Sequence, residues 1–486
     1  MMRSLFSGVS GLKVHQTKMD VIGNNIANVN TAGFKSSSVV FSDILYQTTQ
    51  AATGPNPSTG AAGQNPMQIG LGANVSSITT NISGSGGSER TDNPFDIRIT
   101  GDAFFIVNSG GTNYFTKAGS FKVDANGTLC TSFGAPVMGW QPDEEGLEII
   151  QDAVSPLTIM SAENTYAEPE ATKNCYVTGN IDQKDSQLAS DGVGKPVQIG
   201  LFDSLGNSYL VKVSLKQVAG KPNEYTVSLT DIVDSDNKSI MTKVTKDASG
   251  KETIAASGLS VSFNGVTYAY DATSGTIKAG GTENSLVFDA ATGKFVNAGT
   301  TAAGTDVKKA LDLKMSTTDT TSPFKGNGQT VSIDFSTITM YSQSGSSSLE
   351  AKKGVSSTDN SGAGKKVGNM TGVSIDASGK IRGTYDNGTS KLLGQIAVAT
   401  FPNASGLESV GNNMFAATKN SGEFDGMGKD PTAGGNSLTT GVLEMSNVDL
   451  SSEFTSMITT QRGFQANSRI ITTSDTMLEE LINLKR

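Results

Sequence analysis

The sequence predicts an α+β protein in which mainly antiparallel β domains are nested between N- and C-terminal helices that form coiled coils. One observation comes from the ends, where apolar residues repeat every seven positions. The other comes from the interior, where 56 of 486 residues in the whole chain are glycine and short alternating apolar runs are bounded by turn residues. Only 17% of the residues are charged, which favours strands and turns over charged helices.

The terminal segments are predicted to be amphipathic helices, the first running from Ser4 to about Val29. An isolated helix of this kind is only marginal in water, so each stripe requires a helix to cover it, in the same chain or in a neighbour. The N-terminal stripe comprises Leu5, Leu12, Met19 and Ile26, and the C-terminal stripe comprises Leu450, Met457, Phe464, Ile471 and Leu478.

After the first helix, residues 44–88 contain no Asp, Glu, Lys or Arg. Gly, Ser, Thr, Asn and Gln dominate this stretch, a composition typical of a flexible linker. A charge-free segment is also suited to lie against other protein surfaces, where an unpaired charge is costly. The sequence leaves both interpretations open.

The interior is predicted to form mostly antiparallel sheet from residue 93 onward. Ile97 and Ile99 alternate with polar residues, and Asn264-Gly265 supplies the positive φ angles of a tight hairpin turn. Polar, turn-rich stretches near 165–175 and 355–370 mark an inserted unit. We therefore expect a terminal helical core of 1–30 with 445–486, a connector of 31–92, an inner β domain of 93–165 with 371–444, and an outer β domain of 166–370.

Composition excludes several functions. A net charge of −9 without a basic cluster gives no positively charged segment that would bind nucleic acid. The only histidine, His15, lies on the first predicted helix and is expected at a helix interface, so no catalytic residue, cofactor or metal site is predicted. Cys130 and Cys175 are too few for a disulfide framework, although a bond between them stays open. Without a visible secretory signal, composition alone predicts a cytoplasmic protein.

Three groups of motifs change that expectation. Residues 5–12 (LFSGVSGL) with 19–35 (MDVIGNNIANVNTAGFK), residues 101–107 (GDAFFIV) with 114–121 (YFTKAGSF), and residues 443–451 (LEMSNVDLS) with 461–468 (QRGFQANS) closely resemble the bacterial flagellar rod and hook protein family. Rod proteins of this family are usually shorter, so the length and the long insertion favour the hook branch. A distal rod subunit is the alternative within the family, and a β-rich secreted hydrolase or adhesin is the alternative outside it.

The resemblance implies a structural role. A hook subunit is a non-enzymatic building block of a curved, hollow homopolymer that serves motility as a universal joint between rod and filament, without a cofactor. Implied partners are further copies of itself, the distal rod, hook cap and hook–filament junction proteins, and the flagellar type III export apparatus. The implied location is the flagellar hook and basal body, outside the cell after type III export, in place of the cytoplasm.

The resemblance also suggests roles for individual residues. Phe41 and Leu45 are similar to an element that docks hook and rod substrates at the export gate, with a packing role equally open. The terminal helices would form concentric inner tubes around a channel. Some hook proteins are cross-linked through cysteine-derived chemistry, for which Cys175 would be the candidate. Polar candidates for the channel face are Asn24, Asn25, Asn28, Gln461 and Gln465.

Overall fold

The computed structural model describes residues 2–55, 60, 62–143, 146, 148–246, 252–299, 307–317, 324 and 328–484. The chain divides into two compact units. Unit 1 comprises Met1–Thr165, Thr371–Thr384 and Ser390–Arg486, and unit 2 comprises Tyr166–Met370 and Tyr385–Thr389. The chain therefore leaves unit 1 after Thr165, returns at Thr371 and leaves it once more for the short segment Tyr385–Thr389. The long excursion agrees with the inserted unit that the polar stretches near 165–175 and 355–370 indicated.

The bounds of the elements are as follows. The helices are α1 (Met2–Ala27) and α2 (Leu450–Asn483), with the short 3-10 turns η1 (Ala404–Gly406) and η2 (Ala433–Gly435). The earlier strands of unit 1 are β1 (Ser37–Asp43), β2 (Tyr46–Gln50), β3 (Met67–Gly70), β4 (Ala73–Thr80), β5 (Ser88–Arg90), β6 (Ile97–Thr100), β7 (Phe104–Ser109), β8 (Thr112–Thr116), β9 (Phe121–Val123), β10 (Leu129–Thr131), β11 (Met138–Trp140) and β12 (Ser155–Pro156). The returning strands are β28 (Gly368–Ile375), which begins in unit 2, then β29 (Lys380–Tyr385), β30 (Ser390–Ile396), β31 (Val398–Ala399), β32 (Glu408–Gly411), β33 (Met414–Ala416), β34 (Ser437–Thr440) and β35 (Val442–Glu444). The strands of unit 2 are β13 (Tyr166–Ala167), β14 (Asn174–Asn180), β15 (Lys195–Phe202), β16 (Ser208–Val218), β17 (Lys221–Asp234), β18 (Thr242–Lys246), β19 (Glu252–Ala256), β20 (Ser260–Phe263), β21 (Val266–Asp271), β22 (Thr276–Ala279), β23 (Asn284–Phe288), β24 (Phe295–Gly299), β25 (Ala310–Ser316), β26 (Gln329–Thr339) and β27 (Ser348–Lys353).

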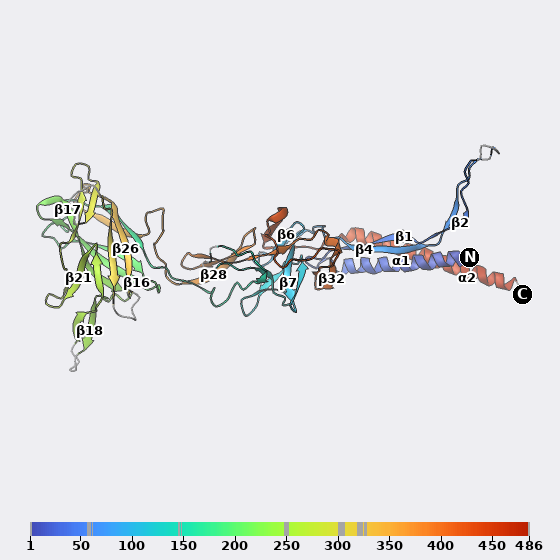
Figure 1. Ribbon diagram of the computed structural model, residues 1–486, viewed down its shortest axis with the longest axis horizontal. Coiled ribbons are helices and arrows are strands. Elements are labelled where there is room, and N and C mark those ends of the chain that lie inside the picture. The colour runs from blue at the N-terminus through green and yellow to red at the C-terminus, as the bar shows by residue number, and fades with distance from the viewer. Residues whose placement is uncertain are drawn as a thin grey trace. The chain divides into compact units, whose positions relative to one another are not determined.

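The two terminal helices of unit 1 lie side by side, α1 in blue and α2 in red in Figure 1. Each terminal helix therefore has the other terminal helix as a partner within the same chain. Helix α2 begins where the side chain of Asp449 accepts a hydrogen bond from the backbone N–H of Ser451 at 2.9 Å, an N-cap that satisfies one of the orphan donors of the first turn. Helix α1 ends two residues earlier than predicted, and the chain then turns through Gly33 at a φ of +74°.

The charge-free stretch of residues 44–88 contains the strands β2, β3 and β4, so its interpretation as a flexible linker is wrong. Strand β1 pairs antiparallel with β4, from Ser37 opposite Thr80 to Asp43 opposite Ala73, and β2 pairs with β3. The β-branched residues of these strands override the linker-like composition, because their alternation fits a pleated backbone. Strands β1 and β4 also contact α1.

The inner part of unit 1 is built around the β7–β8 hairpin. Strands from the returning chain complete its sheet in the order β31-β7-β8-β33-β32. Phenylalanine rings from both passages of the chain close the core, with Phe115 and Phe401 in edge-to-face contact at 4.6 Å. A further sheet has the order β12-β11-β30-β29-β28-β13, and its β28–β13 pairing, between residues 166–167 and 368–369, lies within unit 2.

Unit 2 contains a seven-stranded sheet, β22-β21-β20-β25-β26-β14-β27, and a five-stranded sheet, β15-β16-β17-β23-β24. One large apolar core includes residues from both sheets, among them Tyr225 and Phe335, each fully buried. The predicted turn at Asn264-Gly265 is confirmed, with φ angles of +49° and +86°. The fold class of mainly antiparallel strands between terminal helices is likewise confirmed. The pair β14 and β26 is an exception, since these strands run parallel.

Candidate functional site

Glycines lie at the contact between α1 and α2, which we call the seam. A side chain at Gly8 would meet Ile471 at 3.2 Å, and one at Gly11 would meet the Asn467 side chain at 2.6 Å. On the other helix, a Cβ at Gly463 would lie 2.7 Å from the imidazole of His15. Small residues let the two backbones approach closely, so the seam depends on glycine at these positions.

His15 lies inside this seam, as the sequence predicted. Its ring meets the ring of Phe41 edge to face at 6.0 Å, and its Nδ1 is buried with no hydrogen-bond partner among the described residues. Burial lowers the pKa of His15, and the neighbouring Lys18 lowers it further. The neutral imidazole thus serves as a packing element between α1, α2 and β1.

Of the predicted seven-residue stripes, Ile471 lies in the seam, opposite Gly8. The fully buried residues of the two helices are Gly8, Val14, Ile22 and Asn25 on α1 and Thr460 and Ser474 on α2. Leu450 is exposed. Half-buried stripe residues are Leu5, Leu12, Met19, Ile26, Met457, Phe464, Ile471 and Leu478. That these residues meet neighbouring copies stays a prediction.

Asn25 does not face a channel, so this part of the prediction is wrong. Its side-chain amide donates to the carbonyl of Ser37 at 2.9 Å and to Glu453 at 3.0 Å, and its oxygen accepts from the Ser37 N–H at 3.0 Å. The amide therefore ties α1 to β1 and α2. Among the other polar candidates, Asn24, Gln461 and Gln465 are exposed and Asn28 is half-buried.

A buried ion pair connects the segment between α1 and β1 with strand β35, and the sequence analysis did not predict it. Lys35 Nζ lies 2.9 Å from Glu444 Oε1 and donates to the Gly84 carbonyl at 2.7 Å. The same carboxylate oxygen accepts the Gly86 N–H at 3.1 Å. The side chains are 1% and 2% exposed. One signal was available, because Lys35 and Glu444 each lie inside a motif that carries the family resemblance.

A second buried lysine lies near this pair. Lys117 Nζ donates to the Gly101 carbonyl at 2.6 Å and sits over the Phe104 ring at 4.9 Å. Burial lowers the pKa of Lys117 to about 8; the charge of Glu444 acts in the opposite direction, and that of Lys35 lowers it further. Glu444 is thus a counter-charge for two buried ammonium groups.

Four flagellar family models match the chain. They are described as "Flagella basal body rod protein" over residues 5–35, "Flagellar hook protein FlgE/F/G D1 domain" over 98–163, "Flagellar basal body protein FlaE D2 domain" over 177–355 and "Flagellar basal body rod FlgEFG protein C-terminal" over 439–484. The "Flagellar hook protein FlgE" of Treponema pallidum is 33% identical over 497 aligned residues, which cover 100% of each chain. The chain belongs to the flagellar hook protein FlgE family.

Two further similar proteins are a rod protein and a solved hook protein structure. The "Flagellar basal-body rod protein FlgG" of Bacillus subtilis is 27% identical and covers 100% of each chain, so length alone does not separate hook from rod proteins. The solved structure of Helicobacter pylori flagellar hook protein FlgE2 is 16% identical, covers 72% of this chain and 98% of that one, and aligns with a TM-score of 0.32. The resemblance read from the motifs is confirmed by the full-length FlgE relative.

In this FlgE-family chain, the residues of the possible export element take different positions. Phe41 packs on α1, with its ring beside His15 and Lys18 Nζ 5.6 Å from its centroid. Leu45 is 63% exposed and follows the end of β1. Both side chains are therefore accessible in the folded chain, Phe41 at 36% exposure beside α1 and Leu45 at 63%.

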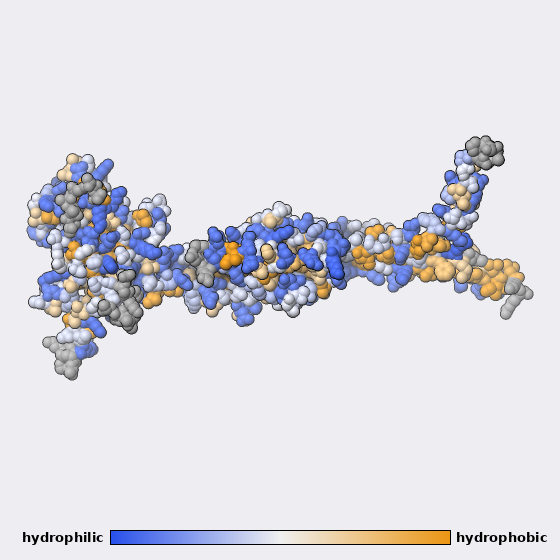
Figure 2. Space-filling view, in the orientation of Figure 1, coloured by the Kyte–Doolittle hydropathy of each residue, from blue (hydrophilic) through white to orange (hydrophobic). Residues whose placement is uncertain are grey.

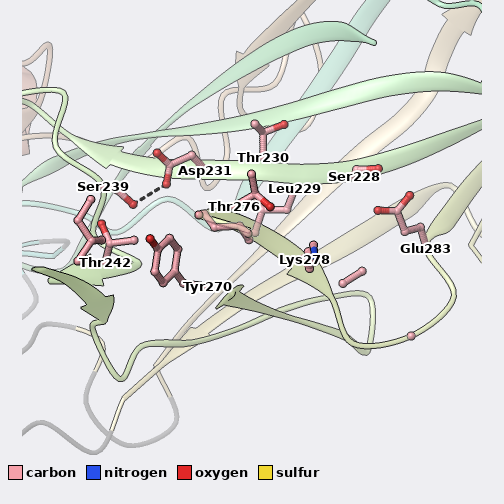
Figure 3. Close-up of a pocket in the computed structure, with 15 residues that line it drawn as sticks. Ser228, Leu229, Thr230, Asp231, Ser239, Thr242, Tyr270, Thr276, Lys278 and Glu283 are labelled. Carbon is pink, nitrogen blue, oxygen red and sulfur yellow. Dashed lines mark hydrogen bonds between the residues drawn. The ribbon is translucent and has the colours of Figure 1, made fainter. Parts of the chain in front are cut away.

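Unit 2 contains an open hollow of about 730 Å³ between β17, β21, β22 and the start of the β18–β19 hairpin. Figure 3 shows that its labelled side chains include Asp231, Tyr270, Lys278 and Glu283. Asp231 accepts the Ser239 hydroxyl at 2.6 Å, and Lys278 pairs with Asp271 at 2.8 Å. Among the residues that the structure describes, no group of three His, Cys, Asp or Glu is placed to hold a metal.

Both cysteines of the FlgE-family chain are free thiols, so the disulfide left open by the sequence is not formed. Cys175 is buried in unit 2, and burial raises its pKa to about 12. Cys130 is half-buried in unit 1. Neither described helix carries a stretch long and apolar enough to cross a membrane.

Proposed function

We propose that this chain is a hook subunit that polymerises into a curved, hollow tube and acts as a universal joint between rod and filament. The observation that carries the proposal is the terminal helix pair, which holds together within one copy yet leaves apolar side chains such as Phe6, Phe454 and Ile458 exposed. Exposed apolar surface of this kind marks a protein–protein interface. The role is structural, and no catalytic step is assigned to any residue.

Four functional parts belong to this proposal. The core of 1–30 with 445–486 would line the export channel, with the uncharged Asn24, Gln461 and Gln465 available to its inner face. The connector of 31–92 and the inner β domain of 93–165 with 371–444 would surround the core. The outer β domain of 166–370 would form the outer contacts. An uncharged polar channel lining would let unfolded chains pass without strong binding.

The connector is proposed to slide against neighbouring subunits as the joint bends. Strands β2 and β3 form a separate two-stranded pair whose apolar residues Tyr46, Met67 and Ile69 are exposed. An isolated hairpin is marginally stable in water, so a neighbour that covers it would stabilise it. Replacing residues 50–66, of which 56–59 and 61 lie outside the described residues, should change hook curvature in electron micrographs. Hooks of unchanged shape would contradict this role.

Export by the flagellar type III apparatus, through Phe41 and Leu45, is also part of the proposal. The two residues differ in their contacts, because the 36% exposed Phe41 also meets His15 and Lys18 of α1 whereas Leu45 is 63% exposed. Leu45→Ala should reduce secretion of the chain into the medium without changing its thermal unfolding. Normal secretion of Leu45→Ala would contradict a role of Leu45 in export.

Contacts with the distal rod, hook cap and hook–filament junction proteins follow from a hook position. Electron microscopy of cells that lack the gene tests the whole assignment. Loss of curved hooks with retention of the rod supports a hook subunit, and loss of the distal rod supports the rod alternative. Intact flagella in such cells would refute both.

A further inference from the structure

The open hollow of unit 2 lies where the chain passes from one sheet to the other. Strand β17 pairs with β23 from Glu224 to Val227, and beyond Val227 no described strand pairs with β17 on that side. Strand β22, at the edge of the seven-stranded sheet, lies against β17 and lines the hollow along its whole length. Two walls of the hollow are therefore strands of the β framework.

Strand β22 presents main-chain groups at this edge. The N–H of Gly280 donates to the Thr267 carbonyl at 2.7 Å, which fixes the hydrogen-bonding phase of the β21–β22 hairpin. Because hydrogen-bonded and non-hydrogen-bonded positions alternate in an antiparallel pair, Ile277 and Ala279 direct their N–H and C=O groups away from β21. Both residues line the hollow. The edge of β22 therefore supplies main-chain donors and acceptors that no described strand uses.

Several polar side chains that line the hollow form no hydrogen bond with another described residue. Tyr270 on β21 and Glu283, which precedes β23, are both half-buried and leave their side-chain oxygens unpaired. Asp231 accepts the Ser239 hydroxyl and the Ile232 N–H through one oxygen, Oδ1, so its second oxygen remains available. In Figure 3, Tyr270 lies below Asp231, and Glu283 lies at the other end of the labelled side chains. The unpaired hydroxyls of the walls are those of Ser228, Thr230 and Thr242.

The charges of the hollow select against an anionic ligand. Lys278 is the only basic residue among the described lining residues, and its ammonium group already pairs with Asp271 at 2.8 Å. Asp231 and Glu283 keep carboxylate oxygens that no described cation contacts within 4 Å. Carboxylate oxygens accept hydrogen bonds and donate none. A ligand that offers several donors and carries no negative charge therefore fits the hollow.

Apolar groups accompany the ring of Tyr270. Leu229, Ile254 and Ile277 line the same hollow. The face of unit 2 seen in Figure 2 is mainly hydrophilic, with hydrophobic residues scattered over it, so a grouping of this kind differs from that surface. The negative face of an aromatic ring attracts the weakly positive C–H groups of a ligand. The volume of about 730 Å³ also falls within the range of about 300–1,000 Å³ that is typical of ligand sites.

We propose that this hollow is a saccharide-binding site, in which a sugar ring stacks on Tyr270 and its hydroxyl groups donate to Asp231 and Glu283. A neutral sugar combines several hydroxyl donors with a face of C–H groups, which are the two properties that the hollow matches. The main-chain groups of β22 bind the remaining hydroxyls. The site is independent of hook assembly, because it lies within unit 2 and uses no residue of the terminal helices.

Isothermal titration calorimetry of the full chain with neutral disaccharides tests the site. The probes are N,N′-diacetylchitobiose, lactose and maltose, and at least one of them should bind. Tyr270→Ala should weaken this binding at least about tenfold, whereas Tyr270→Phe, which keeps the ring, should weaken it less than about threefold. The matched control is Tyr341→Ala, which should bind as the parent chain does, because Tyr341 is 49% exposed and lies outside the lining of the hollow.

A carboxylate variant tests the polar side of the site. Glu283→Gln should weaken sugar binding about fivefold through loss of a charge-assisted hydrogen bond, and Glu350→Gln on exposed β27 should leave it unchanged. Equal circular dichroism spectra show that each variant folds. Putrescine, a diamine without hydroxyl groups, distinguishes a sugar site from an amine site. The proposal is overturned if none of the disaccharides binds, if only putrescine binds, or if Tyr270→Ala and Glu283→Gln bind sugar as tightly as the parent chain.

Discussion

The buried pair of Lys35 and Glu444 yields the most quantitative prediction. Glu444→Gln keeps the shape of the side chain and one acceptor oxygen, yet removes the negative charge beside Lys35. The ammonium group would then stay buried at 1% exposure with no carboxylate partner at 2.9 Å. Breaking a buried ion pair in this way costs about 3–5 kcal/mol, which is a large part of the stability of a domain.

The double variant gives the sharper result. Lys35→Met alone leaves a buried carboxylate whose remaining bond is to Gly86, so it should also cost about 3–5 kcal/mol. Lys35→Met with Glu444→Gln contains neither charge of the pair. Its deficits are the Gly84 carbonyl, which loses its ammonium donor at a cost of about 1–3 kcal/mol, and Lys117, which loses the counter-charge of Glu444 as it does in Glu444→Gln alone. The double variant should therefore be at least as stable as either single variant.

Urea unfolding followed by tryptophan fluorescence measures these differences. Trp140 is the only tryptophan of the chain and is buried in unit 1, where its indole N–H donates to the carbonyls of Asp152 and Met427. The exposed Lys122 of the same unit provides the control, since Lys122→Met should change the free energy of unfolding by no more than about 0.5 kcal/mol. If the two single losses simply add in the double variant, to within about 0.5 kcal/mol, the reasoning is refuted.

Three further predictions follow from the described contacts. Burial lowers the pKa of Lys117 to about 8 from 10.5, so between pH 8 and pH 10.5 the unfolded chain binds more protons than the folded chain. The free energy of unfolding of unit 1 should therefore rise with pH over this range. The urea midpoint of Lys117→Met should not show this rise. Gly463→Ala should destabilise the helix pair by about 1–3 kcal/mol, because the added methyl group would contact His15. Gly23→Ala should stabilise it by up to about 1 kcal/mol, because a Cβ at Gly23 meets no described atom within 4 Å. Thermal melts followed by helix content compare the two variants, and equal effects would contradict the seam geometry. Cys175, whose pKa burial raises to about 12, should resist alkylation at pH 8 until urea unfolds unit 2, and mass spectrometry showing rapid labelling of the folded chain would contradict that burial.

The extent of sequence prediction differs between local and distant features. The terminal helices, the turn at Asn264-Gly265 and the position of His15 were predictable, since helical periodicity and turn chemistry involve residues close in the chain. The flexible-linker interpretation of residues 44–88 is wrong, because cross-strand pairing of β1 with β4 and of β2 with β3 decides the structure there and composition does not. Pairing over such a distance leaves little signal in composition.

The sequence alone determined the α+β class, the apolar character of both ends and, through its motifs, membership in the hook and rod family. These properties depend on local periodicity and on the types and order of neighbouring residues, which the sequence contains directly. Tertiary structure decided the rest. The register of α1 on α2, the burial of Asn25 and the pairing of Lys35 with Glu444, 409 residues apart, depend on which distant groups meet. Burial and electrostatic energies act through space, so the spacing of residues along the chain does not contain them.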